Sequence, residues 1–99
     1  MAEANKPDSN IVFIGVKPLM NYVTNISMIF TTHNTEEVIV KSRGKFISKC
    51  VDVAEVACKR FMENKIEVKN IKINSEEFTN EHGKLIRVSS IEIFLGKKV

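Results

Sequence analysis

The sequence predicts an α+β fold, a two-layer α/β sandwich with the element order β-α-β-α-β-β and a long protruding C-terminal β-hairpin. Two segments with apolar residues at helical spacing alternate with β-branched runs, and a polar turn separates two strand-like segments near the C-terminus. The length of 99 residues suits one domain, and the 43% hydrophobic content is enough for a folded core.

The N-terminal part begins with a polar segment. Residues 1–9 lack apolar periodicity and contain Pro7, which predicts a flexible tail before a single domain at residues 10–99. Residues 10–15, NIVFIG, form an almost continuous apolar run that ends in glycine. Such a run predicts a strand that is buried on both faces.

The first helix is expected to begin at Lys17-Pro18, because proline at the first helical position has a preset φ and loses no helical hydrogen bond. One apolar stripe follows at steps of three and four residues: Leu19, Tyr22, Val23, Ile26, Ile29 and Phe30. This stripe is typical of a core-facing helix. The opposite side carries almost no charge and consists of Asn21, Thr24, Asn25, Ser27 and Thr31. We expect a face of this kind to pack against a partner.

Residues 37–41, EVIVK, predict a short strand, and residues 42–45 predict a loop that leads into a second helix. Apolar residues again follow the helical period: Ile47, Cys50, Val51, Ala54, Ala57, Cys58 and Phe61. The helix is expected to end at Asn64-Lys65. We expect Ile47, Val51, Ala54 and Cys58 to lie in the core.

Residues 66–79 and 85–95 predict two long strands joined by a turn at residues 80–83. Both strands change apolar parity: Ile66 and Val68 give way to Ile71 and Ile73, and Ile86 and Val88 give way to Ile91, Ile93 and Leu95. The change predicts a bulge or a strong twist in each strand. The base of the hairpin would then lie in the core, while the polar tip leaves the globule.

The basic residues are unevenly distributed. Fifteen Lys and Arg against twelve Asp and Glu give a net charge of +3, an excess that matters only if it is gathered in one place. Lys41, Arg43, Lys45 and Lys49 lie within nine positions. Such a cluster is either a solvated helix start or an anion-binding surface. Positive side chains at a helix N-terminus oppose the macrodipole, and a glycine-bearing loop before a helix suits a phosphate, so the pattern favours phosphate binding.

The two cysteines, Cys50 and Cys58, fall on the second predicted helix. Eight residues of helical rise separate them by about 12 Å, which is beyond the reach of a disulfide. They are interpreted as small buried hydrophobes. Since no signal peptide and no apolar run of about 20 residues is found, we expect an intracellular, reduced and soluble protein that does not enter a membrane.

Four separated segments resemble the Alba family of archaeal nucleic-acid-binding proteins: NIVFIGVKPLMNYV (10–23), KSRGKFISKCVDVAE (41–55), KIEVKNIKI (65–73) and RVSSIEIFL (87–95). The resemblance implies a homodimer that coats, compacts and protects double-stranded DNA with little sequence preference and also binds RNA. It implies no catalytic activity, and it implies a cytoplasmic protein associated with the chromosome or nucleoid. In the family, neighbouring dimers also touch along DNA.

The resemblance also assigns residues by position. The implied nucleic-acid contacts are Lys17, Arg43, Gly44, Lys45, the supporting Lys49, and Lys84 and Arg87 at the hairpin tip. Three acids near that tip, Glu76, Glu77 and Glu81, argue instead for a solvated hairpin. Asn21 and Phe61 are the candidates for contacts between subunits or between dimers.

One position departs from the family. Its typical G-K-K-P reads Gly15-Val16-Lys17-Pro18 here, so the first lysine, which is associated with regulation by acetylation in the family, is absent. We therefore expect the salt dependence of binding to be shallower by about 0.9 for each lost phosphate contact. Ser42 and Phe46 also stand where the family usually has smaller or different residues.

Two rival functions remain open. One is an RNA-binding subunit similar to the Alba-related proteins of ribonuclease P, and the other is a small dimeric metabolite-binding regulatory domain. Catalysis is not expected, because no HExxH, GxSxG, P-loop or CxxC pattern occurs and His33 and His82 are far apart in sequence. For the same reason no cofactor and no metal site is expected.

Overall fold

The computed structural model describes residues 10–33 and 35–98, so the predicted tail at residues 1–9 lies outside the described residues. The elements, in chain order, are β1 (Ile11–Phe13), α1 (Leu19–Thr32), β2 (Glu37–Arg43), the 3₁₀ turn η3 (Gly44–Phe46), α2 (Ile47–Val56), the π-helical turn η4 (Ala57–Phe61), β3 (Ile66–Thr79) and β4 (Leu85–Lys97). The predicted α+β order is confirmed. Within the described ranges, no helix is long and apolar enough to cross a membrane.

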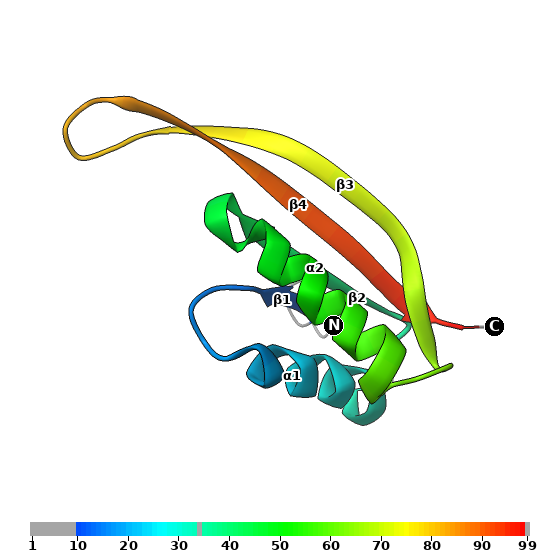
Figure 1. Cartoon of the computed structure of the whole chain (residues 1–99). Coiled ribbons are helices and arrows are strands. Elements are labelled where there is room, and N and C mark those ends of the chain that lie inside the picture. Colours follow the sequence, from blue (N-terminus) through cyan, green and yellow to red (C-terminus); the bar gives the residue numbers. More distant parts are fainter. Residues whose placement is uncertain (1–9, 34, 99) are drawn as a thin grey trace, which may run out of the picture.

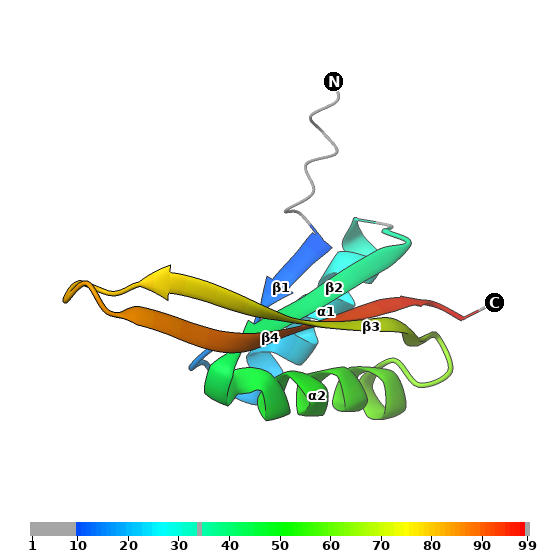
Figure 2. The same ribbon diagram turned by 90° about the horizontal axis from the view of Figure 1, so that it is seen from above.

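The strands form one four-stranded sheet with the order β1-β2-β4-β3. β1 and β2 run parallel, and the other neighbouring pairs are antiparallel. Figure 1 shows α1 and α2 together on one face of this sheet, with the β3–β4 hairpin extending beyond them as an arm. The view from above shows the same arm leaving the body (Figure 2). The protein is therefore a two-layer sandwich with a protruding hairpin.

The core lies between the helices and the sheet. The α1 stripe is confirmed, because Tyr22, Val23, Ile26, Ile29 and Phe30 are all buried. Facing side chains come from every strand: Val12, Val38, Val40, Ile66, Ile91, Ile93 and Leu95. Each fully buried aliphatic side chain stabilises the folded state by about 1.5–3 kcal/mol relative to leaving it exposed. This apolar layer therefore holds both helices against the sheet.

Two expectations about the first elements need correction. The strand at residues 10–15 is not buried on both faces, because β1 is an edge strand and its Phe13 is 66% exposed. Helices cover only one face of the sheet, so alternate side chains on β1 point away from the core. Pro18 is the N-cap of α1 rather than its first helical residue.

The buried side of α2 also differs from the expectation. Val51 is 42% exposed, whereas Val53, which was not assigned to the core, is fully buried. The residues that face the core follow i, i+3, i+4, i+7 and i+8 spacing from Cys50: Val53, Ala54, Ala57 and Cys58. Val51 lies next to this stripe but outside it.

The hairpin follows the predicted bounds closely. The Asn80 side-chain oxygen accepts hydrogen bonds from the backbone N–H groups of His82 and Lys84, both at 2.9 Å, and closes the turn. A register shift between Val68 and Asn70 confirms the bulge in β3. Of the two alternatives predicted for β4, a bulge or a strong twist, the bulge is absent, because β4 pairs without a shift on both of its edges. In a strand without a bulge, the change of parity means that Ile86 and Val88 lie on the opposite face from the core residues Ile91 and Ile93.

Candidate nucleic-acid interface

The segment between β1 and α1 carries Lys17 at one end of the molecule. Ile14 N–H donates to the Lys41 carbonyl at 2.8 Å and continues the sheet contact beyond β1. The Tyr22 hydroxyl on α1 then accepts hydrogen bonds from the N–H groups of Gly15 at 2.9 Å and Lys17 at 3.0 Å. The exposed Lys17 side chain therefore projects from a main chain that is held by the first turn of α1.

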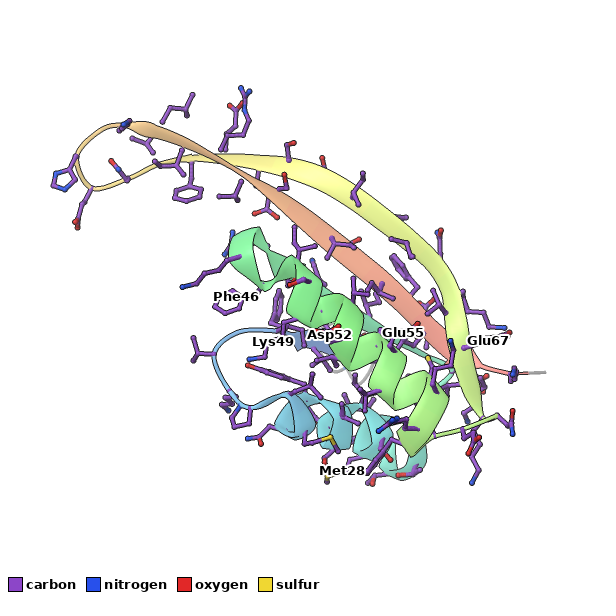
Figure 3. All side chains as sticks on the ribbon, viewed as in Figure 1. Met28, Phe46, Lys49, Asp52, Glu55 and Glu67 are labelled. Atoms are coloured by element: carbon purple, nitrogen blue, oxygen red, sulfur yellow. The ribbon has the colours of Figure 1, made fainter. Side chains whose placement is uncertain are left out.

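Lys49 holds the same segment from α2. Its ammonium group donates to the Gly15 carbonyl at 2.7 Å and to the Lys17 carbonyl, and it lies 5.4 Å from the centre of the Tyr22 ring. Figure 3 shows Lys49 in the first turn of α2, on the side of the segment that leads into α1. Lys49 was predicted as a supporting phosphate contact, but its amine is occupied by protein carbonyls in this structure.

The basic loop starts later than predicted. Ser42 and Arg43 are the last residues of β2, so only residues 44–46 form the connection to α2. Gly44 has a φ of 59°, a left-handed conformation that glycine adopts without a steric cost. Lys45 is exposed, and its amine lies 5.4 Å from the centre of the Phe46 ring. The three residues predicted to grip phosphate here, Arg43, Gly44 and Lys45, are thus adjacent and exposed to solvent, at the end of β2 and in this connection.

Both helices begin at the end of the sandwich that carries these cations, and the hairpin tip points the same way (Figures 1 and 2). The N-caps are Pro18 for α1 and Phe46 for α2, and neither receives a side-chain capping bond from the described residues. Neither first turn contains an acidic residue. The positive ends of two helix dipoles therefore add to the charges of Lys17 and Lys45.

The hairpin brings acids close to the basic loop. Arg43 Nη1 lies 2.8 Å from Glu76 Oε1 on β3, and Arg87 forms an ion pair with Glu77. A groove of about 1190 Å³ runs between the loop and the hairpin; its charged lining residues are Lys41, Arg43, Lys45, Lys72, Glu76, Glu77 and Glu92. Of the two predicted hairpin contacts, Arg87 is neutralised by a neighbour, whereas Lys84 is exposed beside the turn.

The two candidate assembly residues are not brought together. Asn21 lies exposed in the first turn of α1, and Phe61 is 47% exposed at the end of η4. Because both helices begin at the same end of the sandwich, these residues lie toward opposite ends (Figure 1). Within one chain they therefore do not form a single surface patch.

The cysteines lie in the core, away from this surface. Burial raises the pKa of the Cys50 thiol, and burial together with the Glu55 charge raises the pKa of Cys58. Both are free thiols. Across residues 10–33 and 35–98, no group of three or more His, Cys, Asp or Glu side chains is arranged to hold a metal ion.

The sequence model of the Alba family matches residues 10–75, the part that contains both helices and the basic loop. The chain belongs to the Alba family. Two archaeal relatives, each named DNA/RNA-binding protein Alba, come from Methanococcus maripaludis and Methanocella arvoryzae. The first is 48% identical over 89% of this chain and 98% of its own length, and the second is 46% identical over 90% and 91%.

Solved Alba structures have the same fold. Alba from Thermoplasma volcanium superimposes with a TM-score of 0.79 at 42% identity and covers 88% of this chain and 99% of its own. ALBA1 from Trypanosoma brucei gives a TM-score of 0.67 at 23% identity, covering 90% of this chain and 69% of its own, and shows the fold alone. The Alba fold expected from the sequence motifs is therefore confirmed.

Two residues of this surface were missed at the level of sequence. Tyr22 was assigned only to the core stripe, although its hydroxyl holds the Lys17 segment. A tyrosine in an otherwise aliphatic stripe, one turn after the helix start, was the available signal, because a buried hydroxyl needs a partner. Glu76 was recognised as an acid near the hairpin tip, but its pairing with Arg43 was not.

Proposed function

We propose that this Alba-family chain binds double-stranded DNA with little base readout, coats and compacts it, and also binds RNA. The observation that carries the proposal is the position of Lys17 and Lys45 beside the starts of two helices, neither of which has a side-chain cap, at one end of the molecule. The names of the archaeal relatives support the same ligand class. We further propose that the protein works in the cytoplasm, on the chromosome.

The proposed contacts are electrostatic. Lys17, Arg43 and Lys45 are long cations on main chain that is fixed by a turn or a strand end, so they can reach phosphate oxygens without entering a groove. Gly44 leaves the loop backbone open, since a Cβ added there would meet nothing within 4 Å. Each phosphate contact releases counterions, so affinity falls steeply with salt. Little sequence preference follows, because phosphates carry no base information.

We propose that the chain is a homodimer that pairs through β3 and α2. Ile71 is 54% and Ile73 is 79% exposed, yet they pair in register with the core residues Ile93 and Ile91 and so face the helix side of the sheet. Val51 on α2 is exposed as well. β3 is a 14-residue edge strand, and long apolar edges are normally covered in native proteins. A second copy would cover these side chains.

Contacts between neighbouring dimers are proposed to use the weakly charged face of α1 and the end of η4. Figure 3 shows Met28 on the side of α1 that faces away from α2, and its side chain is 55% exposed. Asn21 shares the helix, while Phe61 lies at the far end of α2. Their separation suits a contact in which one dimer uses the α1 side and its neighbour uses the Phe61 end.

The test is a fluorescence anisotropy titration of the native chain with a short duplex DNA and with a structured RNA, each at low and at physiological salt. The proposal expects binding of both ligands, weakening steeply with salt. Preference for the RNA at both salt concentrations would favour the RNA-subunit alternative. No binding to either ligand at low salt would refute the proposal and favour a metabolite-binding domain.

A further inference from the structure

The main chain that carries Lys17 is held by two side chains from two different helices. Tyr22 on α1 accepts from the N–H groups of Gly15 and Lys17. Lys49 on α2 donates to the carbonyls of the same two residues. All four polar backbone groups of Gly15 and Lys17 are therefore bound, although the segment is neither helix nor strand.

We propose that Tyr22 and Lys49 are positioning residues that fix Lys17 for phosphate contact, and that Lys49 acts through these hydrogen bonds rather than by touching the phosphate. The inference rests on the proposed use of Lys17 in nucleic-acid binding. It reassigns Lys49, because an amine that already donates to two carbonyls has little capacity left for a phosphate.

The segment has few other restraints. Val16 is 86% exposed and buries almost no surface, so it anchors nothing. Pro18 fixes its own φ, at −58°, and disfavours a helical conformation at Lys17, but it bonds to none of the four polar groups. Without the Tyr22 and Lys49 bonds, the Gly15 and Lys17 peptide groups would bond to water in many conformations. Nucleic acid would then have to order the segment as it bound, which lowers affinity.

The two side chains also support each other. The Lys49 ammonium lies 5.4 Å from the centre of the Tyr22 ring, a cation–π distance. Tyr22 is only 8% exposed, so its hydroxyl has a fixed position at the edge of the core. This arrangement joins the starts of α1 and α2 through the Lys17 segment, and it would transmit a shift of either helix to Lys17.

The alternative is that Tyr22 serves the core alone. Tyr22→Phe separates the two roles, because it keeps the ring and removes only the hydroxyl that accepts both hydrogen bonds. A core role predicts that the variant behaves like the native chain. A positioning role predicts a local change at Gly15 and Lys17 together with weaker binding.

The first measurement is amide hydrogen exchange by NMR on the free protein. We expect Tyr22→Phe to speed exchange at the Gly15 and Lys17 amides by about tenfold, since each loses its acceptor. The Ile14 amide, which bonds to the Lys41 carbonyl, is the internal control and should not change. Lys49→Met is a second variant, and it should speed exchange at the same two amides with the Tyr22 hydroxyl intact. Unchanged exchange at both amides in both variants would overturn the inference.

The second measurement is a double-mutant cycle on duplex DNA affinity with Tyr22→Phe and Lys17→Ala. We expect Tyr22→Phe to weaken binding by about three- to tenfold with an unchanged salt slope, because no charge is removed. In the Lys17→Ala background the same change should have no further effect. An equal loss with and without Lys17 would mean that the hydroxyl does not act through Lys17, which overturns the inference.

A comparison with the basic loop distinguishes failure of this inference from failure of the proposed function. If Arg43→Ala plus Lys45→Ala weakens binding while Lys17→Ala has no effect, the proposed function stands and the positioning role is overturned. If the native chain binds no nucleic acid, both fail together.

Discussion

The guanidinium of Arg43, at the end of β2, lies 2.8 Å from the carboxylate of Glu76, in the half of β3 nearer the hairpin tip. This ion pair joins the basic loop to the hairpin across 33 residues of sequence. Both side chains are largely open to solvent, at 62% and 45% exposure. A phosphate that approaches Arg43 therefore has to compete with a carboxylate that is already in place.

We expect Glu76→Gln to strengthen duplex DNA binding. An exposed ion pair is worth about 0.2–1 kcal/mol, so its removal should raise affinity by up to about fivefold. Glu63→Gln is the matched control, because Glu63 is an exposed acid in the turn after η4, far from the basic loop. Anisotropy titrations at two salt concentrations measure the effect. An equal gain from both variants would indicate a general charge effect and contradict the specific competition.

Of the two glycines compared at this surface, Gly44 and Gly15, Gly44 should tolerate substitution by alanine less well. Its φ of 59° is left-handed, so Gly44→Ala is expected to destabilise the fold by about 1 kcal/mol, although the added methyl meets nothing within 4 Å. Gly15→Ala is the control, since its Cβ would touch only the Tyr22 hydroxyl at an ordinary 3.6 Å. Urea unfolding measures both. Equal destabilisation would show that the turn at Gly44 is not strained by a side chain.

Ile73→Glu should break the proposed homodimer. The side chain is 79% exposed in the single chain and would be buried by a second copy, where an unpaired carboxylate is strongly unfavourable. We expect a monomer by sedimentation equilibrium at concentrations where the native chain is dimeric. Met28→Glu, on the α1 face, is the control and should leave the dimer intact. If Met28→Glu gave a monomer while Ile73→Glu remained a dimer, the subunit contact would lie on α1.

The buried cysteines predict a loss of stability at alkaline pH. Burial raises the pKa of Cys50 and Cys58 above the ordinary 9.0, so the folded state keeps thiol protons that the unfolded chain releases. The unfolded state then binds fewer protons, and the free energy of unfolding falls as pH rises above about 9. A variant with Cys50→Ala and Cys58→Ala should show a flatter decline in urea unfolding from about pH 8 to 10. If the free energy of unfolding of this variant fell with pH as steeply as that of the native chain, the decline could not be assigned to the two buried thiols.

Much of the fold could be predicted because its patterns are local. The hairpin at residues 66–79 and 85–95 was recognisable from alternating apolar residues around a polar turn, and the α1 stripe from spacing alone. The buried side of α2 was harder, because Val51 and Val53 are equally apolar. Only the placement of α1 and the sheet around the helix decides which of them is buried.

The candidate site was predictable in its residue types but not in its pairings. The cluster at residues 43–45 and the single Lys17 were visible as charges near two helix starts. The bond from Lys49 to the Gly15 carbonyl spans 34 residues, and that from Arg43 to Glu76 spans 33. Such contacts depend on how the elements pack. The sequence therefore identifies the cations of this surface, but it does not show which of them form hydrogen bonds or ion pairs within the protein.

The central claim is that Arg43 and Lys45 contact phosphates, and the salt dependence of duplex affinity in Arg43→Ala plus Lys45→Ala tests it most directly. We predict weaker binding and a salt slope that is shallower by about 0.9 for each lost contact. The control is Lys59→Ala plus Arg60→Ala, which removes the same charge from η4 at the other end of α2 and should preserve the slope. An unchanged slope in the Arg43 and Lys45 variant, or the same reduction in both, would contradict the claim.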